Sequence, residues 1–573
     1  MLPQALVALS LFLSAVQPAS ALWPQPRQIT TDQTALKLSP GFDIKLTGIH
    51  NAPKDLTDAV SRTSSFLRKD KLEALVVDRG ASSAKVVKAA KSLKALRVSL
   101  TGDSKTVKSI SEEATLPLES RSESYTLTIP ADGSDATLQA NSTLGLFRGL
   151  TTFEQIWYEL DGNTYTLQAP FDIVDSPAYP YRGLMLDTAR NFFPVEDIKR
   201  TLDAMSWAKI NTFHWHVVDS QSFPLQIPGF MELSQTAAYN SRAVYSPADV
   251  KDVVSYAAAR GIDVIAEIDT PGHTAAIAKS HPEHIACPEA SPWTQFANEP
   301  PAGQLRLANE QTTKFTSSLL TSAASLFKSH YFGTGGDEIN LNCYAKDEQT
   351  QAELTAQNKT IDSALDAFTQ ASHKALKAVG KTPVVWEGKQ TSLKNPHKYS
   401  STSTEMLLVH PVTLDPETLV LVWISADNVK SVVDKGFKVI HAANDYFYLD
   451  CGGGGWVGQN VLGNSWCDPF KTWQKAYSFD PLANLTPDQH HLVQGGQHLL
   501  WTEQSSPSNL DSTVWPRAAT SAEVFWSGPG GDVGAALPRL HDLAYRYKQR
   551  GVRAISLQPE WCALRPGKCD LNA

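Results

Sequence analysis

After Pro177 the chain alternates short apolar runs with stretches whose apolar residues recur at helical spacing. The runs are nearly continuous in hydrophobic residues, which is typical of strands buried on both faces of a parallel sheet. They cover residues 182–189, 212–219, 263–269, 331–337, 383–388, 419–425, 438–445 and 498–503. Helical stretches include 195–210, 247–261, 361–380 and 514–527. Eight such units predict an α/β fold, a (β/α)8 TIM barrel that occupies residues 176–573.

Residues 22–175 have a mixed pattern that differs from the barrel region. Strand-like segments are 36–46, 97–102, 124–133 and 136–141, and helix-like segments are 55–69 and 142–160. We expect a small α/β domain here, since 573 residues exceed what one hydrophobic core usually serves. An alternative treats the first part as a propeptide, with Arg68-Lys69 as a weak processing site.

The first 21 residues predict a secretory signal peptide. They contain no charged side chain, carry an apolar run over residues 5–16, and end in Ala19-Ser20-Ala21, a small-residue cleavage signature. A membrane anchor is the alternative, but the run is shorter than the roughly 20 residues that span a bilayer. We therefore expect a secreted, extracellular protein without a membrane partner.

Export changes the interpretation of two further patterns. Three Asn-x-Ser/Thr sequons, at Asn141, Asn358 and Asn484, become candidate glycosylation sites. Six cysteines in an exported protein favour three disulfides, and sequence order suggests one set of pairs, although other pairings are allowed. The suggested pairs are Cys287–Cys343, Cys451–Cys467 and Cys562–Cys569.

The formal charge of −8 is spread along the chain, and charged residues make up 19% of it. No basic cluster of the kind that binds phosphate backbones occurs. The composition therefore argues against a nucleic-acid partner.

Acidic and aromatic residues recur where the predicted barrel strands end, which is where barrels of this type build their active sites. In strand order they are Arg190, Asp219, Asp269 with His273, Asp337 with Glu338, Trp386, Trp423, Tyr448 with Asp450, and Trp501 with Glu503. Indole planes stack on sugar rings, and carboxylates accept hydrogen bonds from hydroxyl groups. The recurrence predicts a carbohydrate site, although any single tryptophan more commonly caps a core.

Asp337 and Glu338 are direct neighbours in the stretch GTGGDEIN. Ordinary retaining glycosidases place two carboxyl groups roughly 5 to 5.5 Å apart on opposite sides of the anomeric carbon. Adjacent residues, with Cα atoms about 3.8 Å apart, put both groups on one wall. The pair suits chemistry in which the substrate supplies its own nucleophile, such as a 2-acetamido carbonyl. One acid then donates a proton, and its neighbour orients and stabilises that nucleophile.

The sequence resembles family 20 glycoside hydrolases, the exo-acting β-N-acetylhexosaminidases, and most closely their secreted fungal-type members. The match includes RGLMLDTARNFFP at 182–194, FHWHVVD, EIDTPGH, GTGGDEIN, VVWEG, LVLVWIS, YFYLDCG, LLWTE and WPRAATSAEVFW, which ends at residue 526. The resemblance implies hydrolysis of terminal β-linked N-acetylhexosamine through an oxazolinium intermediate, without a cofactor or metal.

Residue roles follow from the same resemblance. It implies that Glu338 is the general acid and base, and that Asp337 holds the acetamido N–H and stabilises the oxazolinium ion. An ionised Asp337 would help Glu338 to keep its proton. Tyr448 would donate to the acetamido oxygen. Other implied substrate contacts are Trp386, Trp423, Trp501, Arg190, Asp450 and Glu503, with Asp219, Asp269 and His273 in support.

Two features of the biology stay open at this level. Chitin fragments and glycoprotein glycans both end in the required sugar, with GlcNAc and GalNAc as alternative end groups. Fungal-type relatives are often dimers, so the resemblance implies a homodimer.

Two rival functions compete with hydrolysis of amino sugars. His214-Trp215-His216 imitates the metal pair of barrel amidohydrolases, because residues i and i+2 of a strand share a face. His410 and His441 are poorly placed to complete such a site, so packing and support are the favoured roles for this pair. The second rival is a sugar-binding protein without chemistry, which the intact Asp337-Glu338 pair argues against.

Overall fold

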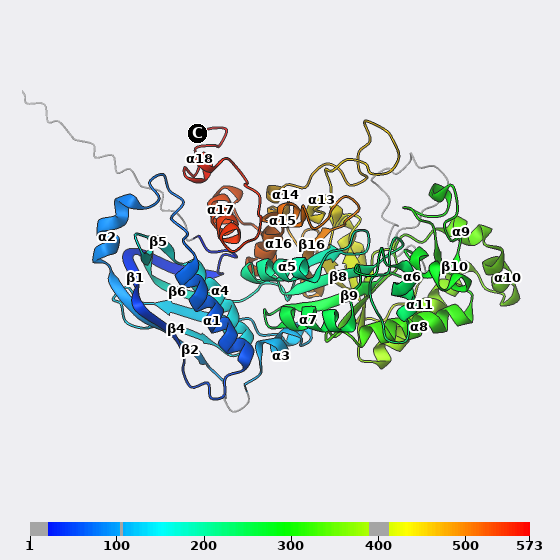
Figure 1. Ribbon diagram of the computed structural model, residues 1–573, viewed down its shortest axis with the longest axis horizontal. Coiled ribbons are helices and arrows are strands. Elements are labelled where there is room, and N and C mark those ends of the chain that lie inside the picture. The colour runs from blue at the N-terminus through cyan, green and yellow to red at the C-terminus, as the bar shows by residue number, and fades with distance from the viewer. Residues whose placement is uncertain (1–20, 103–106, 389–411) are drawn as a thin grey trace, which may run out of the picture.

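The computed structural model describes residues 21–102, 107–388 and 412–573. A sheet domain and a barrel lie side by side along the long axis of the molecule (Figure 1). Residues 1–20 of the predicted signal peptide, and His410, lie outside the described residues.

A single mixed sheet forms the N-terminal domain. Its strands are β1 (Gln28–Leu46), β2 (Lys91–Leu100), β3 (Tyr125–Ile129), β4 (Ala136–Ala140), β5 (Tyr158–Leu160) and β6 (Asn163–Asp175), in the order β1-β2-β4-β3-β6-β5. The helices are α1 (Lys54–Lys69), α2 (Ala84–Ala89), α3 (Ile110–Ala114) and α4 (Thr143–Gln155). Alternate residues of β3 and β4 are buried, so these strands present one apolar face to the core of the domain.

The helix predicted for residues 142–160 ends earlier than expected. Ser142 caps α4 by accepting a hydrogen bond from the Gly145 backbone N–H, but α4 stops at Gln155. Residues 158–160 instead form β5, which pairs with β6 across a tight turn at Asp161 and Gly162, both with positive φ. Local apolar spacing alone does not reveal this strand pairing.

β1 lies inside the sheet, since it pairs with β2 in parallel and with β6 in antiparallel register. Ahead of it, Trp23 is fully buried and donates its indole N–H to the Ala519 carbonyl oxygen at 2.8 Å. Excision up to Lys69 would remove β1 and this anchor together. We therefore propose that the segment stays in the mature protein and is not a propeptide.

The second domain is a closed eight-stranded parallel barrel, as predicted. Its strands are β7 (Tyr181–Asp187), β8 (Thr212–Val218), β9 (Asp263–Ile268), β12 (Tyr331–Gly335), β13 (Thr382–Trp386), β14 (Leu419–Val422), β15 (Lys438–His441) and β16 (Val493–Leu500). β16 closes the ring by pairing with β7. A small hairpin of β10 (Ile285–Ala286) and β11 (Gln304–Leu305) projects from the segment after β9.

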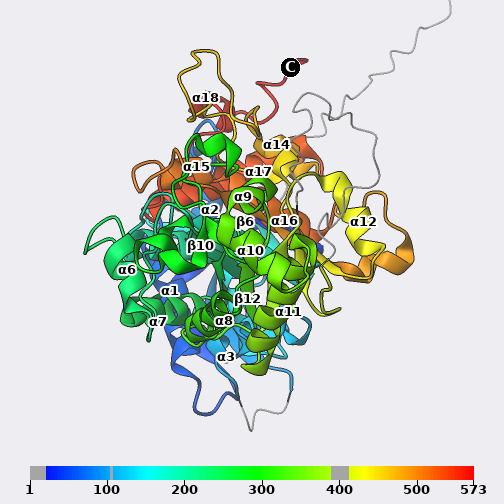
Figure 2. The same cartoon turned by 90° about the vertical axis from the view of Figure 1, so that its right-hand side faces the viewer.

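Helices follow the barrel strands, and the longer amphipathic ones, such as Val195–Trp207 and Ile361–Ala378, bury one apolar face. They are α5 (Val195–Trp207), α6 (Met231–Ala237), α7 (Pro247–Ala258), α8 (Glu310–Ala324), α9 (Leu341–Lys346), α10 (Glu348–Ala356), α11 (Ile361–Ala378), α12 (Val429–Val433), α13 (Asn444–Phe447), α14 (Trp473–Tyr477), α15 (Leu510–Val514), α16 (Arg517–Ser527), α17 (Val533–Gln549) and α18 (Glu560–Ala563). Figure 2 shows α8, α10 and α11 on the end away from the N-terminal sheet.

A buried charge cluster joins the two domains. Glu123, just before β3, accepts hydrogen bonds from Arg148 of α4 at 2.7 Å and from Arg182 of β7 at 2.5 Å. Its other oxygen accepts from the Asn211 side chain at 3.0 Å. Burial raises the pKa of Glu123, but the charges of Arg182 and Arg148 outweigh burial and lower it to about 2. The carboxylate therefore stays ionised and fixes the sheet domain on the barrel.

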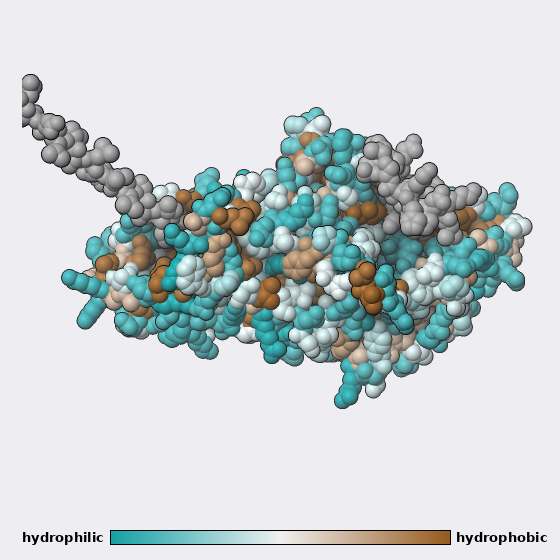
Figure 3. Space-filling model, turned by 90° about the horizontal axis from the view of Figure 1, so that it is seen from above, coloured by the Kyte–Doolittle hydropathy of each residue, from teal (hydrophilic) through white to brown (hydrophobic). Residues whose placement is uncertain are grey.

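The predicted disulfide pairing is confirmed, with bonds Cys287–Cys343, Cys451–Cys467 and Cys562–Cys569. The sequon residues Asn141, Asn358 and Asn484 are all exposed, and their glycosylation stays a prediction. Within the described part of the chain, no helix is both long and apolar enough to cross a bilayer. The face seen in Figure 3 is mostly hydrophilic, with scattered hydrophobic residues.

Candidate active site

The ends of the barrel strands surround one pocket, and eleven of the twelve predicted site residues line it. They are Arg190, Asp269, His273, Asp337, Glu338, Trp386, Trp423, Tyr448, Asp450, Trp501 and Glu503. The twelfth, Asp219, is fully buried and contacts the lining residues Arg190 and His273. Residues more than 300 positions apart in sequence therefore share one site, as the barrel topology requires.

The turn that follows β12 explains why two glycines precede the acidic pair. Gly335 has a φ of +69°, and a Cβ on it would lie 1.7 Å from Asp269 Oδ1. The Gly336 backbone N–H donates to the same oxygen at 3.0 Å. Glycine at position 335 thus allows the backbone to approach Asp269 closely, which no larger residue could do.

Glu338 itself has a φ of +54°, in the left-handed region that non-glycine residues rarely adopt. Such a conformation costs on the order of 1–3 kcal/mol and persists only where the surrounding structure enforces it. The result is that neighbouring carboxylates have different environments: Asp337 is 7% exposed, whereas the Glu338 side chain is 23% exposed. One acid is held in the wall of the pocket and the other lies nearer its opening.

A chain of contacts reaches Glu338 from the barrel interior. His273 Nδ1 lies 3.1 Å from Asp219 Oδ1, and His273 Nε2 lies 3.4 Å from Glu338 Oε2. Burial lowers the pKa of His273, but Asp219 and Glu338 outweigh burial and raise it well above its ordinary value. A protonated His273 therefore connects a buried carboxylate to the predicted proton donor.

Burial and the charge of Asp269 raise the pKa of Asp337 well above its usual range. Burial likewise raises the pKa of Asp269 to about 6. The two carboxyls together hold a proton more readily than isolated carboxyls do. This differs from the expectation that Asp337 stays ionised, because the sequence placed Asp269 in support of the acidic pair but did not show that the two carboxyls are buried together.

Arg190 lies at the centre of a second acidic group. Its Nη2 is 2.6 Å from Glu299 Oε1, and its Nη1 is 3.1 Å from Asp219 Oδ2 and 3.4 Å from Asp187 Oδ2. Its guanidinium also lies 5.0 Å from the centroid of the Trp501 ring. Burial lowers the pKa of Arg190, but these carboxylates outweigh burial and raise it, so the residue is a fixed cation in the pocket.

Two of the remaining acids face the pocket with raised pKa values. Burial raises the pKa of Asp450 to about 7, and burial raises that of Glu503 well above its usual range despite the charge of Arg190. Among the described residues, no group donates a hydrogen bond to the buried Oδ1 atoms of Asp337 and Asp450. Both atoms are suited to accept hydrogen bonds from N–H or O–H groups of a ligand.

Aromatic side chains form the walls and are themselves held by hydrogen bonds. The Trp386 indole N–H donates to Glu267 Oε1 at 3.0 Å, and the Trp423 indole N–H donates to the Glu387 carbonyl oxygen at 2.7 Å. Tyr448 is 2% exposed, and burial raises its pKa well above its ordinary value, so its hydroxyl keeps its proton. Rigid indole faces and a fixed phenol hydroxyl suit the recognition of a sugar with an amide substituent.

The histidine pair of the amidohydrolase alternative lies in the barrel interior. His216 Nδ1 is 2.6 Å from Glu267 Oε1, and His216 Nε2 is 2.7 Å from Asp219 Oδ2. His214 contacts Glu267 and Gln497 and stacks on Trp386. Both imidazoles support neighbouring residues, in line with the favoured interpretation. His441 contacts the Pro481 carbonyl oxygen instead.

Several pocket residues were not predicted from the sequence. Trp456, Ser465, Trp466 and Gln504 line the pocket together with Glu299. Trp466 is 63% exposed, and its ring packs edge-on against Trp423 and Tyr448. The Cys451–Cys467 disulfide next to it was the available signal that this glycine-rich loop is pinned at the rim. Glu299 follows no periodic pattern, so the sequence contained no signal that would have placed it in the pocket.

Comparisons with known proteins agree with this geometry. Residues 179–529 match the glycosyl hydrolase family 20 catalytic domain, and residues 22–156 match a domain described as beta-acetyl hexosaminidase like. A chitooligosaccharidolytic beta-N-acetylglucosaminidase of Bombyx mori is 36% identical over 460 residues, covering 78% of this chain and 74% of that protein. A beta-hexosaminidase of Arthroderma benhamiae is 34% identical over 469 residues, with coverage of 78% and 74%.

Among solved structures, the chitobiase of Flavobacterium johnsoniae superposes with a TM-score of 0.71 at 25% identity. The superposition covers 93% of this chain and 73% of that one. The catalytic-domain match spans more than half of the chain and contains every predicted site residue. The chain therefore belongs to glycosyl hydrolase family 20.

Proposed function

We propose that the protein is an exo-β-N-acetylhexosaminidase that removes terminal non-reducing β-linked N-acetylhexosamine with retention of configuration, by substrate-assisted catalysis. The observation that carries this proposal is the pair Asp337 and Glu338, which are adjacent, on one wall, and in unlike environments. Two such groups cannot attack from one face and protonate from the other. The nucleophile must then come from the sugar.

In the first step the acetamido oxygen of the substrate attacks the anomeric carbon. The bond from that carbon to the leaving oxygen breaks while Glu338 transfers a proton to the leaving oxygen. The product of this step is an oxazolinium ion on the enzyme. Asp337 in its ionised form accepts a hydrogen bond from the acetamido N–H and stabilises the positive charge. Tyr448 donates its hydroxyl to the acetamido oxygen and orients it for attack.

In the second step a water molecule attacks the anomeric carbon while Glu338 accepts a proton from it. The carbon–oxygen bond of the oxazolinium ring breaks, which restores the acetamido group and releases the sugar. Two inversions at one carbon give net retention. Because the nucleophile is already attached and oriented, the activation free energy can be lower by up to about 7–11 kcal/mol, the range found for intramolecular reactions.

The other pocket residues have binding and positioning roles in this proposal. Arg190, Asp450 and Glu503 bind sugar hydroxyl groups, and Trp386, Trp423 and Trp501 enclose the ring and the acetamido group. His273, held by Asp219, positions Glu338 and its proton. Asp269 positions Asp337.

We further propose chitooligosaccharides as substrates. The names of the matched insect proteins describe chitooligosaccharidolytic enzymes. Exposed indoles of Trp456 and Trp466 beside the pocket offer stacking surfaces to further sugar units of a linear chain. Incubation with chitotetraose and with a biantennary glycan, followed by product analysis, tests this choice. Faster release from the glycan would contradict it.

Secretion and self-association complete the proposal. Three disulfides suit an oxidising compartment, in keeping with the predicted signal peptide. A homodimer stays a prediction of the family resemblance, which sedimentation of the purified protein would test.

Two substrates that differ only in the group on the second sugar carbon test the mechanism directly. We expect a chromogenic N-acetyl-β-glucosaminide to be hydrolysed and the matching β-glucoside, which has a hydroxyl at that carbon, to be inert. A glycosidase with its own nucleophile would cleave both. Comparable rates on the two substrates would overturn substrate assistance, and no hydrolysis of either would favour the binding-protein alternative.

A further inference from the structure

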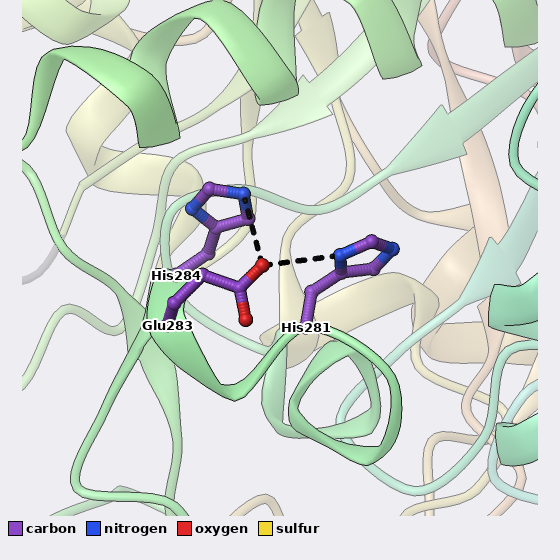
Figure 4. A group of neighbouring side chains, drawn as sticks. All are labelled: His281, Glu283 and His284. Atoms are coloured by element: carbon purple, nitrogen blue, oxygen red, sulfur yellow. Dashed lines mark hydrogen bonds and ion pairs between the residues drawn. The ribbon is translucent and has the colours of Figure 1, made fainter.

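A second cluster of ligand-type side chains lies outside the active site, in the segment that follows β9. His281, Glu283 and His284 come from a single turn around the 3-10 helix Pro282–His284. Figure 4 shows the Glu283 carboxylate between the two imidazoles, and each ring presents one nitrogen to it. The His284 side chain is 10% exposed, that of His281 is 23% exposed and that of Glu283 is 60% exposed, so the cluster is rigid on one side and accessible on the other.

The three ligand atoms converge on one point. Glu283 Oε1 lies 3.4 Å from His281 Nδ1 and 3.9 Å from His284 Nε2, and one ligand atom from each residue lies within 4.8 Å of the others. Zinc binds nitrogen and carboxylate oxygen at about 2.0–2.2 Å in tetrahedral geometry, which places two ligand atoms of one ion about 3.3–3.6 Å apart. The cluster needs only small side-chain movements to reach that spacing.

The outer nitrogens of both rings already have partners. His281 Nε2 lies 3.1 Å from Glu232 Oε1 of α6, and His284 Nδ1 lies 3.0 Å from Thr312 Oγ1 of α8. A proton on each outer nitrogen leaves the inner nitrogens, His281 Nδ1 and His284 Nε2, unprotonated and able to bind a metal ion. Metal-binding histidines are oriented in this manner by a second acceptor, very often a carboxylate.

Packing holds the rings in place. The Phe315 ring centroid on α8 lies 4.9 Å from that of His281 and 4.3 Å from that of His284. Arg306, which follows β11, donates to the carbonyl oxygen of Glu283 at 2.8 Å, and its guanidinium is paired with Asp347 at 3.0 and 3.1 Å. Its charge is therefore largely neutralised.

Simple ion pairing explains the cluster less well. Ion-paired hydrogen bonds between nitrogen and carboxylate oxygen are usually about 2.7–2.9 Å long, and neither contact of Glu283 with the rings is that short.

We propose that His281, Glu283 and His284 form a binding site for one divalent late-transition metal ion, with Zn²⁺ as the preferred ion and water completing its coordination. Two imidazoles and a carboxylate are a ligand set that zinc favours. The ion would brace the segment between β9 and α8 against α6, through Glu232. It is separate from the hydrolytic site and has no part in the reaction.

Zinc binding to untagged, EDTA-treated protein tests the site, with stoichiometry measured by equilibrium dialysis and affinity by titration. We expect one saturable site in the wild type and its loss in His281→Ala and His284→Ala. Glu232→Gln should weaken zinc affinity by about 10- to 100-fold, because it removes the acceptor that orients His281. Each variant should hydrolyse the chromogenic N-acetylglucosaminide at the wild-type rate, which shows that it is folded.

Two adjacent histidines in another segment, His490 and His491, provide the matched control. A His490→Ala/His491→Ala variant removes two surface imidazoles from the 3-10 helix Pro487–Leu492 and should keep the site intact. Zinc should also raise the melting temperature of the wild type but not that of His281→Ala, because the ion binds only the folded site. The site is overturned if the wild type binds no zinc saturably, or if His281→Ala and wild type bind it equally.

Discussion

Two groups of buried carboxylates in this molecule have opposite electrostatic environments. At the domain interface, Glu123 lies between Arg148 and Arg182, and its pKa is lowered to about 2. At the end of β12, Asp337 lies beside Asp269, and burial with like charge raises its pKa. Both sites bear the cost of removing a charge from water. At the first site two arginines offset this cost, whereas at the second the charge of His273 offsets only part of it. Paired acids therefore mark where the fold is fixed, and crowded acids mark where chemistry is expected.

The largest effect on activity should come from replacing Glu338, the acid that protonates the glycosidic oxygen. Glu338→Gln removes the proton donor, so hydrolysis of substrates with a sugar leaving group should fall by at least about 10²- to 10⁴-fold. Aryl substrates with a leaving group that needs little protonation should lose much less. Parallel kinetics on chitobiose and on a dinitrophenyl N-acetylglucosaminide measure the difference.

Glu310→Gln, at an exposed position in the first turn of α8, is the matched control and should behave as wild type. Binding of the product sugar to Glu338→Gln should persist, which calorimetry can measure. Brisk chitobiose turnover by Glu338→Gln would remove Glu338 from its proposed role and would end the distinction between the two carboxylate groups.

The next test changes Glu123, the carboxylate that is paired with two arginines at the domain interface. Glu123→Gln leaves two buried arginines without their carboxylate, which should lower the free energy of unfolding by about 3–5 kcal/mol. The rate constant kcat of the protein that remains folded should not change, since Glu123 lies away from the pocket. Urea denaturation and active-site-normalised kinetics give the two quantities.

Asp135→Asn removes the partner of Arg97 in a pair near the surface and should cost only about 0–1 kcal/mol. Equal destabilisation by Glu123→Gln and Asp135→Asn would contradict the structural role of the buried cluster. A large loss of kcat in Glu123→Gln would show that the two carboxylate groups are not independent.

The smallest effect is a displacement of the pH profile. Asp337 must be ionised to stabilise the oxazolinium ion, and its raised pKa means that activity is lost as pH falls through that pKa. Because burial and the charge of Asp269 raise the pKa of Asp337, kcat/KM should decline at a higher pH than an ordinary carboxyl group would impose. Asp269→Asn removes the neighbouring charge, lowers the pKa of Asp337, and should move the acid limb to lower pH.

Kinetic profiles of wild type and Asp269→Asn on one aryl substrate measure this displacement. The amide that replaces the Asp269 carboxylate can still accept the Gly336 N–H through its oxygen, so the turn itself should survive. An acid limb that stays in place or moves to higher pH would contradict the coupling of Asp269 to Asp337.

Local patterns in the sequence were enough to predict the barrel fold and most of the residues that line the pocket. Near-continuous apolar runs specify buried parallel strands, because both faces of such strands are covered, and this pattern predicted all eight barrel strands. The same logic predicted the positions of Glu338, Trp386 and Tyr448, since the carboxyl ends of the strands must meet at one rim. Residues on irregular loops, such as Glu299 and Trp466, have no periodicity that would indicate them.

What the sequence determined by itself was the barrel, the adjacency of Asp337 and Glu338, and the ring of aromatic residues, because these depend on order and spacing along the chain. Only the tertiary structure decided how each charge behaves. It placed Asp269 against Asp337, two arginines around Glu123, and Glu232 behind His281. Burial and distance set the free energy of a charge in a protein, and both quantities exist only once distant segments have packed together.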